Sequence, residues 1–413
     1  MPRRLRTCLT ALAFTDSFRA RPGLADDARR RAIEGIGTVL DAIIRATMCV
    51  RGLLLAAVLA GLSVSPAHGQ LVAIDEELAR AVTISGEGRG RIDAFVGRHR
   101  ERLMSDDRTD VVTARAALSE PLADTRVSVA FRQALASALE TELQTLAGSD
   151  ESWRRLVGLR LAADLATENT ARLIDAAVDA DEPEVRYFAM FAIETIFDTV
   201  AGSSAAVTDR TLNRLLEHAG TAVSETEDPR YADAAIRAIG AAATIPDGRI
   251  AGLAPRAIGV LADATSALTR RSPAIKADAT SALPLIRGGL IVRNYVAAND
   301  ELPREVALQT IGFGGDLVAF VFARTEQAGG VDDAEPIDFQ LAGIGASLVF
   351  FGEQARARAT RDQPRVGQVD LVTPMRDGDL ANFRSRVLSL VGDAGALRRA
   401  PLSFPGERFD RDN

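Results

Sequence analysis

The sequence has few of the residues that most often carry catalysis or hold a metal ion. It contains three histidines, two cysteines and one tryptophan, and aromatic residues make up only 5% of the chain. His99 and His218 have no neighbouring ligand at metal-binding spacing. The chain also lacks a Gly-x-Ser-x-Gly motif and a phosphate-binding loop with its lysine. We therefore predict no catalytic residue, no metal site and no cofactor.

Both cysteines, Cys8 and Cys49, lie in an N-terminal part that we expect to be removed. A short basic start leads into the uncharged run 52–64, which is followed by small residues. This order of features is typical of a secretory signal peptide, here at 48–69. The run of about 13 residues is shorter than the roughly 20 that span a bilayer as a helix. We predict an exported protein of the periplasm or cell envelope that starts at Gln70, without a thiol or a membrane span.

A signal peptide at 48–69 leaves residues 1–47 as an extension, which we attribute to a start codon assigned too early. In the alternative interpretation, the whole leader stays uncleaved and anchors the protein in the membrane. Residues 1–69 carry ten arginines and five acidic residues, a net charge of +5. Because the whole chain has a net charge of −7, the remaining residues carry a net charge of −12. Because such a chain repels polyanions, we expect no nucleic-acid partner.

Beyond the leader, the sequence indicates one helix after another and no convincing strand. Apolar residues recur at helical spacing over 125–147, 152–165 and 170–178. Thr208 is a predicted N-cap for the helix that follows it. The interior must be built mainly from alanine, leucine, isoleucine and valine, and alanine has the highest helix propensity. The predicted fold class is all-α.

The most informative pattern is a repeat with a period of 46 and then 44 residues, marked by Pro183, Pro229 and Pro273. Proline is tolerated in the first turn of a helix, and Asp228 and Ser272 are good N-caps before it. A period in the forties is typical of stacked helical pairs. Residues that are small or aliphatic, apart from Tyr231, follow each proline at equal distances on one helical face: Val185, Tyr231 and Ile275; Ala189, Ala235 and Ala279; Ala192, Ala238 and Ala282; Ile193, Ile239 and Leu283; Ile196, Ala242 and Ile286.

These repeated segments resemble the second helix of a HEAT repeat. Residues 181–189, Asp-Glu-Pro-Glu-Val-Arg-Tyr-Phe-Ala, have its acidic start, proline, Val-Arg pair and alanine face. The copy at 272–276 keeps the proline, a branched residue and a cation, and the copy at 228–232 keeps the proline and the alanine face. The resemblance is clear over about 165–290. It implies a right-handed α-solenoid of stacked antiparallel helical hairpins, which we expect over 70–360, and it implies no activity.

A set of cations and tyrosines recurs near the starts of the equivalent helices and forms our candidate partner surface. Its members are Arg186, Tyr187, Arg230, Tyr231 and Lys276. In the alternative interpretation, which we favour, the cations pair with acidic residues in the preceding turn, such as Asp181 and Asp228, and Tyr187 and Phe191 pack between repeats. Because solenoids present long surfaces to proteins or peptides, the sequence predicts a non-catalytic scaffold or adaptor with a protein or peptide partner.

Two other functions stay open at this stage. Paired carboxylates could hydrolyse a glycosidic bond on a helical toroid, although sugar-binding tryptophan and tyrosine are scarce. The protein could also be a structural component of the envelope, held there by an uncleaved leader.

The remaining segments are assigned from composition. The glycine clusters at 86–90 and 312–315 are predicted loops, because neither follows a strand. The apolar segments 316–327 and 337–359 are expected to close the array. The tail at 361–413 is predicted to be mostly irregular, with a helix at 378–391 and disorder from Pro401 onward.

Overall fold

The computed structural model describes residues 74–410, apart from 203–204 and 273–278. Within this part the structure is all-α, as predicted: it has sixteen α-helices, four short 3-10 helices and no strand. The chain divides into two units, Met1–Leu71 and Val72–Asn413, and all these helices belong to the second. The predicted extension, the signal peptide, Pro273 and Lys276 lie outside the described residues.

The N-terminal helices are α2 (Glu76–Arg80), α3 (Gly86–Leu103), α4 (Arg108–Ser119), α5 (Val129–Ala138), α6 (Glu140–Ala147), α7 (Ser152–Leu165) and α8 (Glu168–Ala177). The helices from α5 to α8 follow the predicted segments, with one division, and the start of α3 corrects a predicted loop. The segment 125–147 is divided at Leu139, which caps both α5 and α6. The prediction of a loop at 86–90 is wrong, because the Ser85 hydroxyl accepts a hydrogen bond from the Gly88 N–H and starts α3 there.

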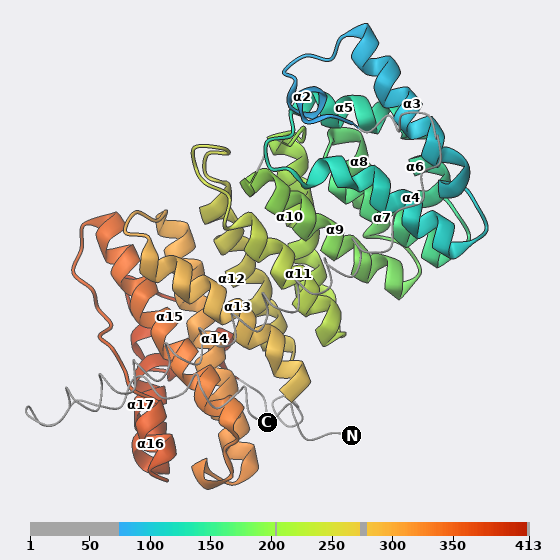
Figure 1. Ribbon diagram of the computed structural model, residues 1–413. Helices are drawn as coiled ribbons and strands as arrows, with labels where there is room; N and C mark the ends of the chain where they lie inside the picture. Colours follow the sequence, from blue (N-terminus) through green and yellow to red (C-terminus); the bar gives the residue numbers. More distant parts are fainter. Residues whose placement is uncertain (1–73, 203–204, 273–278, 411–413) are drawn as a thin grey trace, which may run out of the picture. The chain divides into compact units, whose positions relative to one another are not determined.

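The central helices pack in a helical-repeat-like arrangement (Figure 1). They are α9 (Pro183–Gly202), α10 (Asp209–Glu225), α11 (Pro229–Ala242), α12 (Leu253–Arg271), α13 (Ala279–Ala298), α14 (Arg304–Ala328) and α15 (Pro336–Thr360). Helices α9, α11, α13 and α15 contact one another in succession, and so do α8, α10, α12 and α14. Each helix of the second row also packs against the next helix of the first row. Every helix therefore buries its apolar face against its neighbours in the chain and in its row.

The repeated small and aliphatic positions form the core between α9 and α11. Ala192 and Ile193 in α9, like Ala238 and Ile239 in α11, are at most 2% exposed. Alanine at these positions allows the two helices to approach closely. The third copy departs from the pattern, because Leu283 in α13 is 52% exposed.

The rotation of α13 explains the exposure of Leu283. A β-carbon added to Gly288 would lie 2.8 Å from the Thr265 hydroxyl oxygen of α12, and one added to Gly289 would lie 2.5 Å from Ile344 of α15. These close approaches fix which side of α13 faces its neighbours. The buried stripe consequently runs through Ala282, Leu285, Val292 and Val296, and Leu283 is turned outward.

The prediction of a loop at 312–315 is also wrong, because these glycines lie inside α14. A β-carbon on Gly314 would be 2.8 Å from both the Gly345 carbonyl oxygen and the Val349 nitrogen of α15. The glycines thus serve close contact between two helix backbones. Among the described residues, α14 is the one helix long and apolar enough to cross a membrane, and 83% of that window is buried inside the structure.

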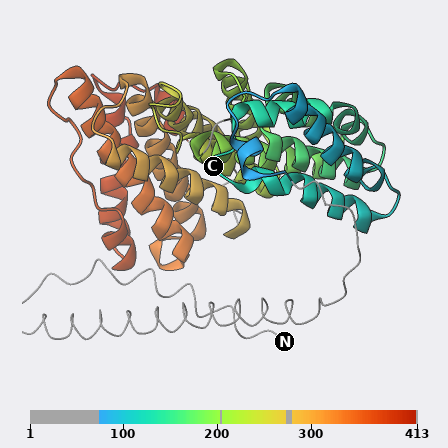
Figure 2. The same cartoon turned by 45° about the horizontal axis from the view of Figure 1, so that its top comes forward.

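The C-terminal segment packs against α14 and α15 (Figure 2). It contains α16 (Val372–Arg376), α17 (Leu380–Val391) and the 3-10 helices η3 (Ala396–Arg398) and η4 (Gly406–Phe409). The prediction of disorder from Pro401 is wrong for residues 401–410. Leu402 and Phe409 are buried there, and Arg408 forms an ion pair with Asp316 of α14.

Candidate partner-binding surface

Helices α9, α11 and α13 together line an open pocket of about 750 Å³. Its apolar part comes mainly from α13, where Leu283, Ile286 and Leu290 follow one another at helical spacing. Its acidic part comes from α9, through Glu194 and Asp198. The pocket therefore has an apolar side and a charged side, and three successive helices of one row line it.

Helix α11 supplies the small residues between these two sides. Gly240, Ala241 and Ala243 line the pocket. A β-carbon on Gly240 would lie 2.9 Å from the Cδ1 atom of Ile291, so the glycine allows α13 to approach α11 closely. Leu283, which is turned outward, lines the open volume together with these small residues.

A ladder of charges crosses the same three helices. Arg237 of α11 lies 3.9 Å from Glu194 of α9 and 3.9 Å from Asp233 on its own helix. Arg287 of α13 lies closer to Asp233, at 2.6 Å. The Arg237 guanidinium carbon also sits 4.2 Å from the centre of the Phe191 ring, which is a cation–π contact. Both cations of the ladder thus already have partners in the protein.

The two acidic residues on α9 are less well compensated. Burial raises the pKa of Glu194; Arg237 acts in the opposite direction, and the nearby charge of Asp198 raises the pKa further. Burial likewise raises the pKa of Asp198, which has no ion-pair partner among the described residues. The wall that α9 contributes to the pocket is therefore electronegative.

The predicted surface residues that the structure describes, Arg186, Tyr187, Arg230 and Tyr231, do not line this pocket. The rings of Tyr187 and Phe191 pack edge to face, with centroids 5.1 Å apart, and Phe191 in turn contacts Arg237 at the pocket. Burial raises the pKa of Tyr231, and the positive charge of Arg186 opposes this shift. Arg186 and Tyr231 therefore lie within electrostatic reach of each other, on neighbouring helices.

The predicted pairing of the cations with acids in the preceding turn takes a different form. The Arg186 guanidinium donates to main-chain carbonyls, 3.0 Å from the oxygen of Ala180 and 3.2 Å from that of Asp181. Arg230 is exposed, and its backbone N–H donates to the Asp228 carboxylate at 2.8 Å, which is an N-cap contact. The preceding turns therefore do contact the first turns of these helices. They do so through main-chain carbonyl groups for Arg186 and through an N-cap carboxylate for Arg230, and not through ion pairs with the cations.

Five functional candidates were missed by the sequence analysis: Glu194, Asp198, Arg237, Leu283 and Arg287. The spacing of Glu194 and Asp198 placed them on one helical face, which was the available signal. Nothing in the sequence alone indicated that this face would line one pocket with residues of α13. Within the described residues, no group of three or more His, Cys, Asp or Glu side chains is arranged to hold a metal ion.

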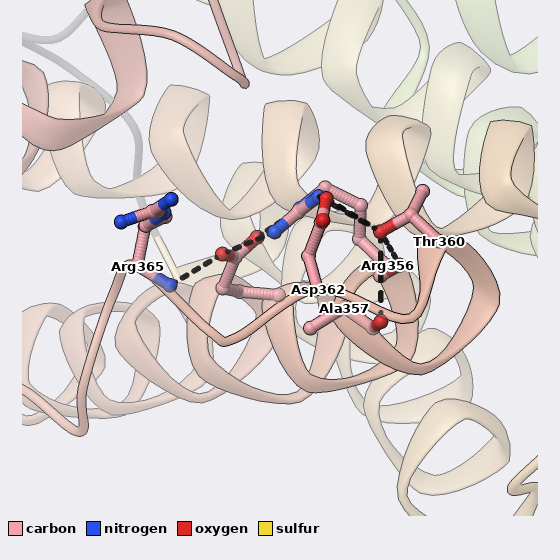
Figure 3. A network of polar contacts seen from close by, with 6 residues as sticks. Arg356, Ala357, Thr360, Asp362 and Arg365 are labelled. Atoms are coloured by element: carbon pink, nitrogen blue, oxygen red, sulfur yellow. Dashed lines mark hydrogen bonds and ion pairs between the residues drawn. The ribbon is translucent and has the colours of Figure 1, made fainter.

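Two buried charge networks lie away from the pocket, and their partners explain them structurally. The Asp316 carboxylate, fully buried in α14, accepts hydrogen bonds from the Ser266 hydroxyl, Arg270 and Arg408. The other network surrounds Arg356 at the end of α15 (Figure 3). Its guanidinium lies 2.7 Å from Glu353 and 3.1 Å from Asp362, and so ties the chain after α15 to the helix.

The chain matches no family model and no curated protein sequence at a significant level. The likeness to HEAT repeats therefore depends on the repeated residues and on the packing of the helices.

Proposed function

We propose that the protein is an exported, non-catalytic scaffold or adaptor, and that the face of α9, α11 and α13 binds a protein or peptide partner. The observation that carries this proposal is the open pocket with Leu283, 52% exposed, among its lining residues. A concave site lined by several aliphatic side chains, here Leu283, Ile286 and Leu290, is typical of a binding surface. In a right-handed α-solenoid, which is the arrangement we propose for the stacked hairpins, successive helices of one row line a continuous surface for such partners.

The arrangement of the carboxylates favours a scaffold over a glycoside hydrolase. Glu194 and Asp198 are four residues apart on α9 and so approach the pocket from the same wall. A glycosidase needs two carboxyl groups that flank the scissile bond from opposite sides. Tyr295 is the one aromatic side chain among the lining residues, which leaves few stacking platforms for a sugar ring.

Photocrosslinking tests the binding face directly. A photoreactive phenylalanine would replace Leu283 in cells that naturally make the protein, and the matched controls would carry it at Val112 or Leu388. Both control residues are 45% exposed, and they lie on α4 and α17, away from the pocket. We expect a discrete adduct at position 283 that is absent at the two controls. The same adducts at all three positions, or none at 283, would refute the proposed face.

Export is tested separately by sequencing the N-terminus of the protein isolated from the cell envelope. We expect a start at or near Gln70. An intact leader, with the protein found only in the membrane fraction, would favour the anchored envelope component.

A further inference from the structure

We infer that the pocket recognises a basic aliphatic peptide segment, in which a leucine-like side chain is followed by a lysine or arginine. This inference depends on the proposed function of the same face and specifies the chemistry of its partner.

The apolar half of the pocket selects the aliphatic side chain. Leu283, Ile286 and Leu290 offer methyl groups to the open volume, which Gly240 and Ala241 of α11 also line. A volume of about 750 Å³ falls within the range of roughly 300–1,000 Å³ that is usual for ligand sites. The site can therefore remove an aliphatic side chain and the adjoining part of a peptide from water.

The charged half of the pocket selects a cation. Glu194, Asp198, Arg237 and Arg287 line the pocket. Asp233 lies beside it and pairs with both arginines, so the cluster as a whole has three acidic residues for two cations. Asp233 lies 2.6 Å from Arg287 and 3.9 Å from Arg237, so the charges of both arginines are already partly compensated.

A positive group bound beside α9 would provide the counter-charge that Asp198 and Glu194 lack. Asp198 has no ion-pair partner among the described residues, and the nearest cation to Glu194 is 3.9 Å away. The repulsion between these two carboxylates would fall when a lysine or arginine binds near them. Complementary charge of this kind determines the specificity of an interface more than its overall strength.

A peptide fits this site better than an isolated amine or a polyanion. The pocket is open and lies across three helices, so an elongated ligand can continue along the face beyond it. Residues 70–413 carry a net charge of −12 when the leader is left out of the sequence, which disfavours nucleic acid and anionic membranes.

Fluorescence anisotropy with three labelled peptides tests the inference on the purified full chain. The peptides repeat the units Ala-Leu-Lys-Ser, Ala-Leu-Glu-Ser and Ala-Ser-Lys-Ser. We expect the first to bind about tenfold more tightly than each of the other two, which is the effect of one favourable charge or one buried side chain.

Two variants and a control separate the contributions. In Glu194→Gln with Asp198→Asn, the preference for lysine over glutamate should fall to about twofold or less. The control, Glu101→Gln with Asp150→Asn, removes the same charge from exposed residues elsewhere and should leave the preference intact. In Leu283→Ser, both leucine peptides should bind about tenfold more weakly. Circular dichroism of each variant checks that it is folded.

The outcomes distinguish this inference from the proposed function. Equal binding of the lysine and glutamate peptides, or a preference that survives in the Glu194→Gln and Asp198→Asn variant, overturns the basic-peptide inference. If Leu283→Ser still weakens binding in that case, the binding face itself stands. If none of the peptides binds, the inference is overturned. The crosslinking at position 283 then determines whether the proposed binding face is correct.

Discussion

The contact between α14 and α15 leads to a strong prediction for Gly314→Ala. The new methyl group would lie 2.8 Å from the Gly345 carbonyl oxygen and 2.8 Å from the Val349 nitrogen. Both atoms belong to the backbone of a helix, so no flexible side chain can move aside. The two helices would have to separate, and the buried residues along them would lose contact.

The size of the effect follows from two opposing contributions. Overpacking a core of this kind costs about 3 kcal/mol at the upper end of the usual range. Replacing glycine by alanine inside a helix returns about 1 kcal/mol through helix propensity. We therefore expect Gly314→Ala to lower the free energy of unfolding by about 2 kcal/mol.

Gly97→Ala is the matched control for this prediction. Gly97 also lies inside a helix, α3, but a β-carbon added there would have no other atom within 4 Å. That variant should gain about 1 kcal/mol, since only the propensity changes. Urea unfolding followed by circular dichroism measures both free energies. A Gly314→Ala protein as stable as the wild type, or an equal loss in both variants, would show that the helices do not depend on this contact.

The double variant Gly314→Ala with Gly345→Ala adds a further check. A β-carbon on Gly345 would lie 3.1 Å from the Gly314 carbonyl oxygen, so both substitutions strain the same contact. Once the first has separated the helices, the second should cost less than it does alone. Strictly additive losses would contradict this account.

Two further predictions concern ion pairs. Arg408→Met should lower the free energy of unfolding by about 2 kcal/mol. This is less than the about 3–5 kcal/mol lost when a buried ion pair is fully broken, because Arg270 still contacts Asp316. A urea titration that finds no loss would refute the role of this contact. Asp124→Asn should lower the melting temperature near neutral pH and have no effect in strong acid. The hydrogen bond from Arg126 holds the pKa of Asp124 well below its ordinary value, so the stability that it contributes is present above the unfolded-state pKa and is lost as the pH falls; a difference that persists in acid would contradict this sign.

Local chemistry made much of the fold predictable. The Thr208 and Asp228 side chains cap α10 and α11 as expected, and α9 and α11 begin at Pro183 and Pro229. The segment 152–165 is a helix with the predicted bounds. These features depend on a few neighbouring residues, so the sequence pattern contains the required information.

Contacts between distant segments decided the points that were wrong. The glycines at 312–315 would disfavour a helix in an isolated peptide. In the folded chain, the absence of a side chain at Gly314 allows the backbones of α14 and α15 to pack in contact. Leu283 occupies a core position of the repeat but is exposed, while Gly288 and Gly289 make the close approaches of α13 to other helices. The pocket needs three assembled helices, and no single segment predicts it.

The carboxylate of Asp316 joins parts of the chain that are made at very different times. Ser266 precedes it by 50 residues, and Arg408 follows it by 92. While the chain grows on the ribosome, α12 and α14 are synthesised long before Arg408. The contacts of Asp316 are therefore completed only after the residues around Arg408 have been added, and until then this carboxylate lacks one of its two arginine partners.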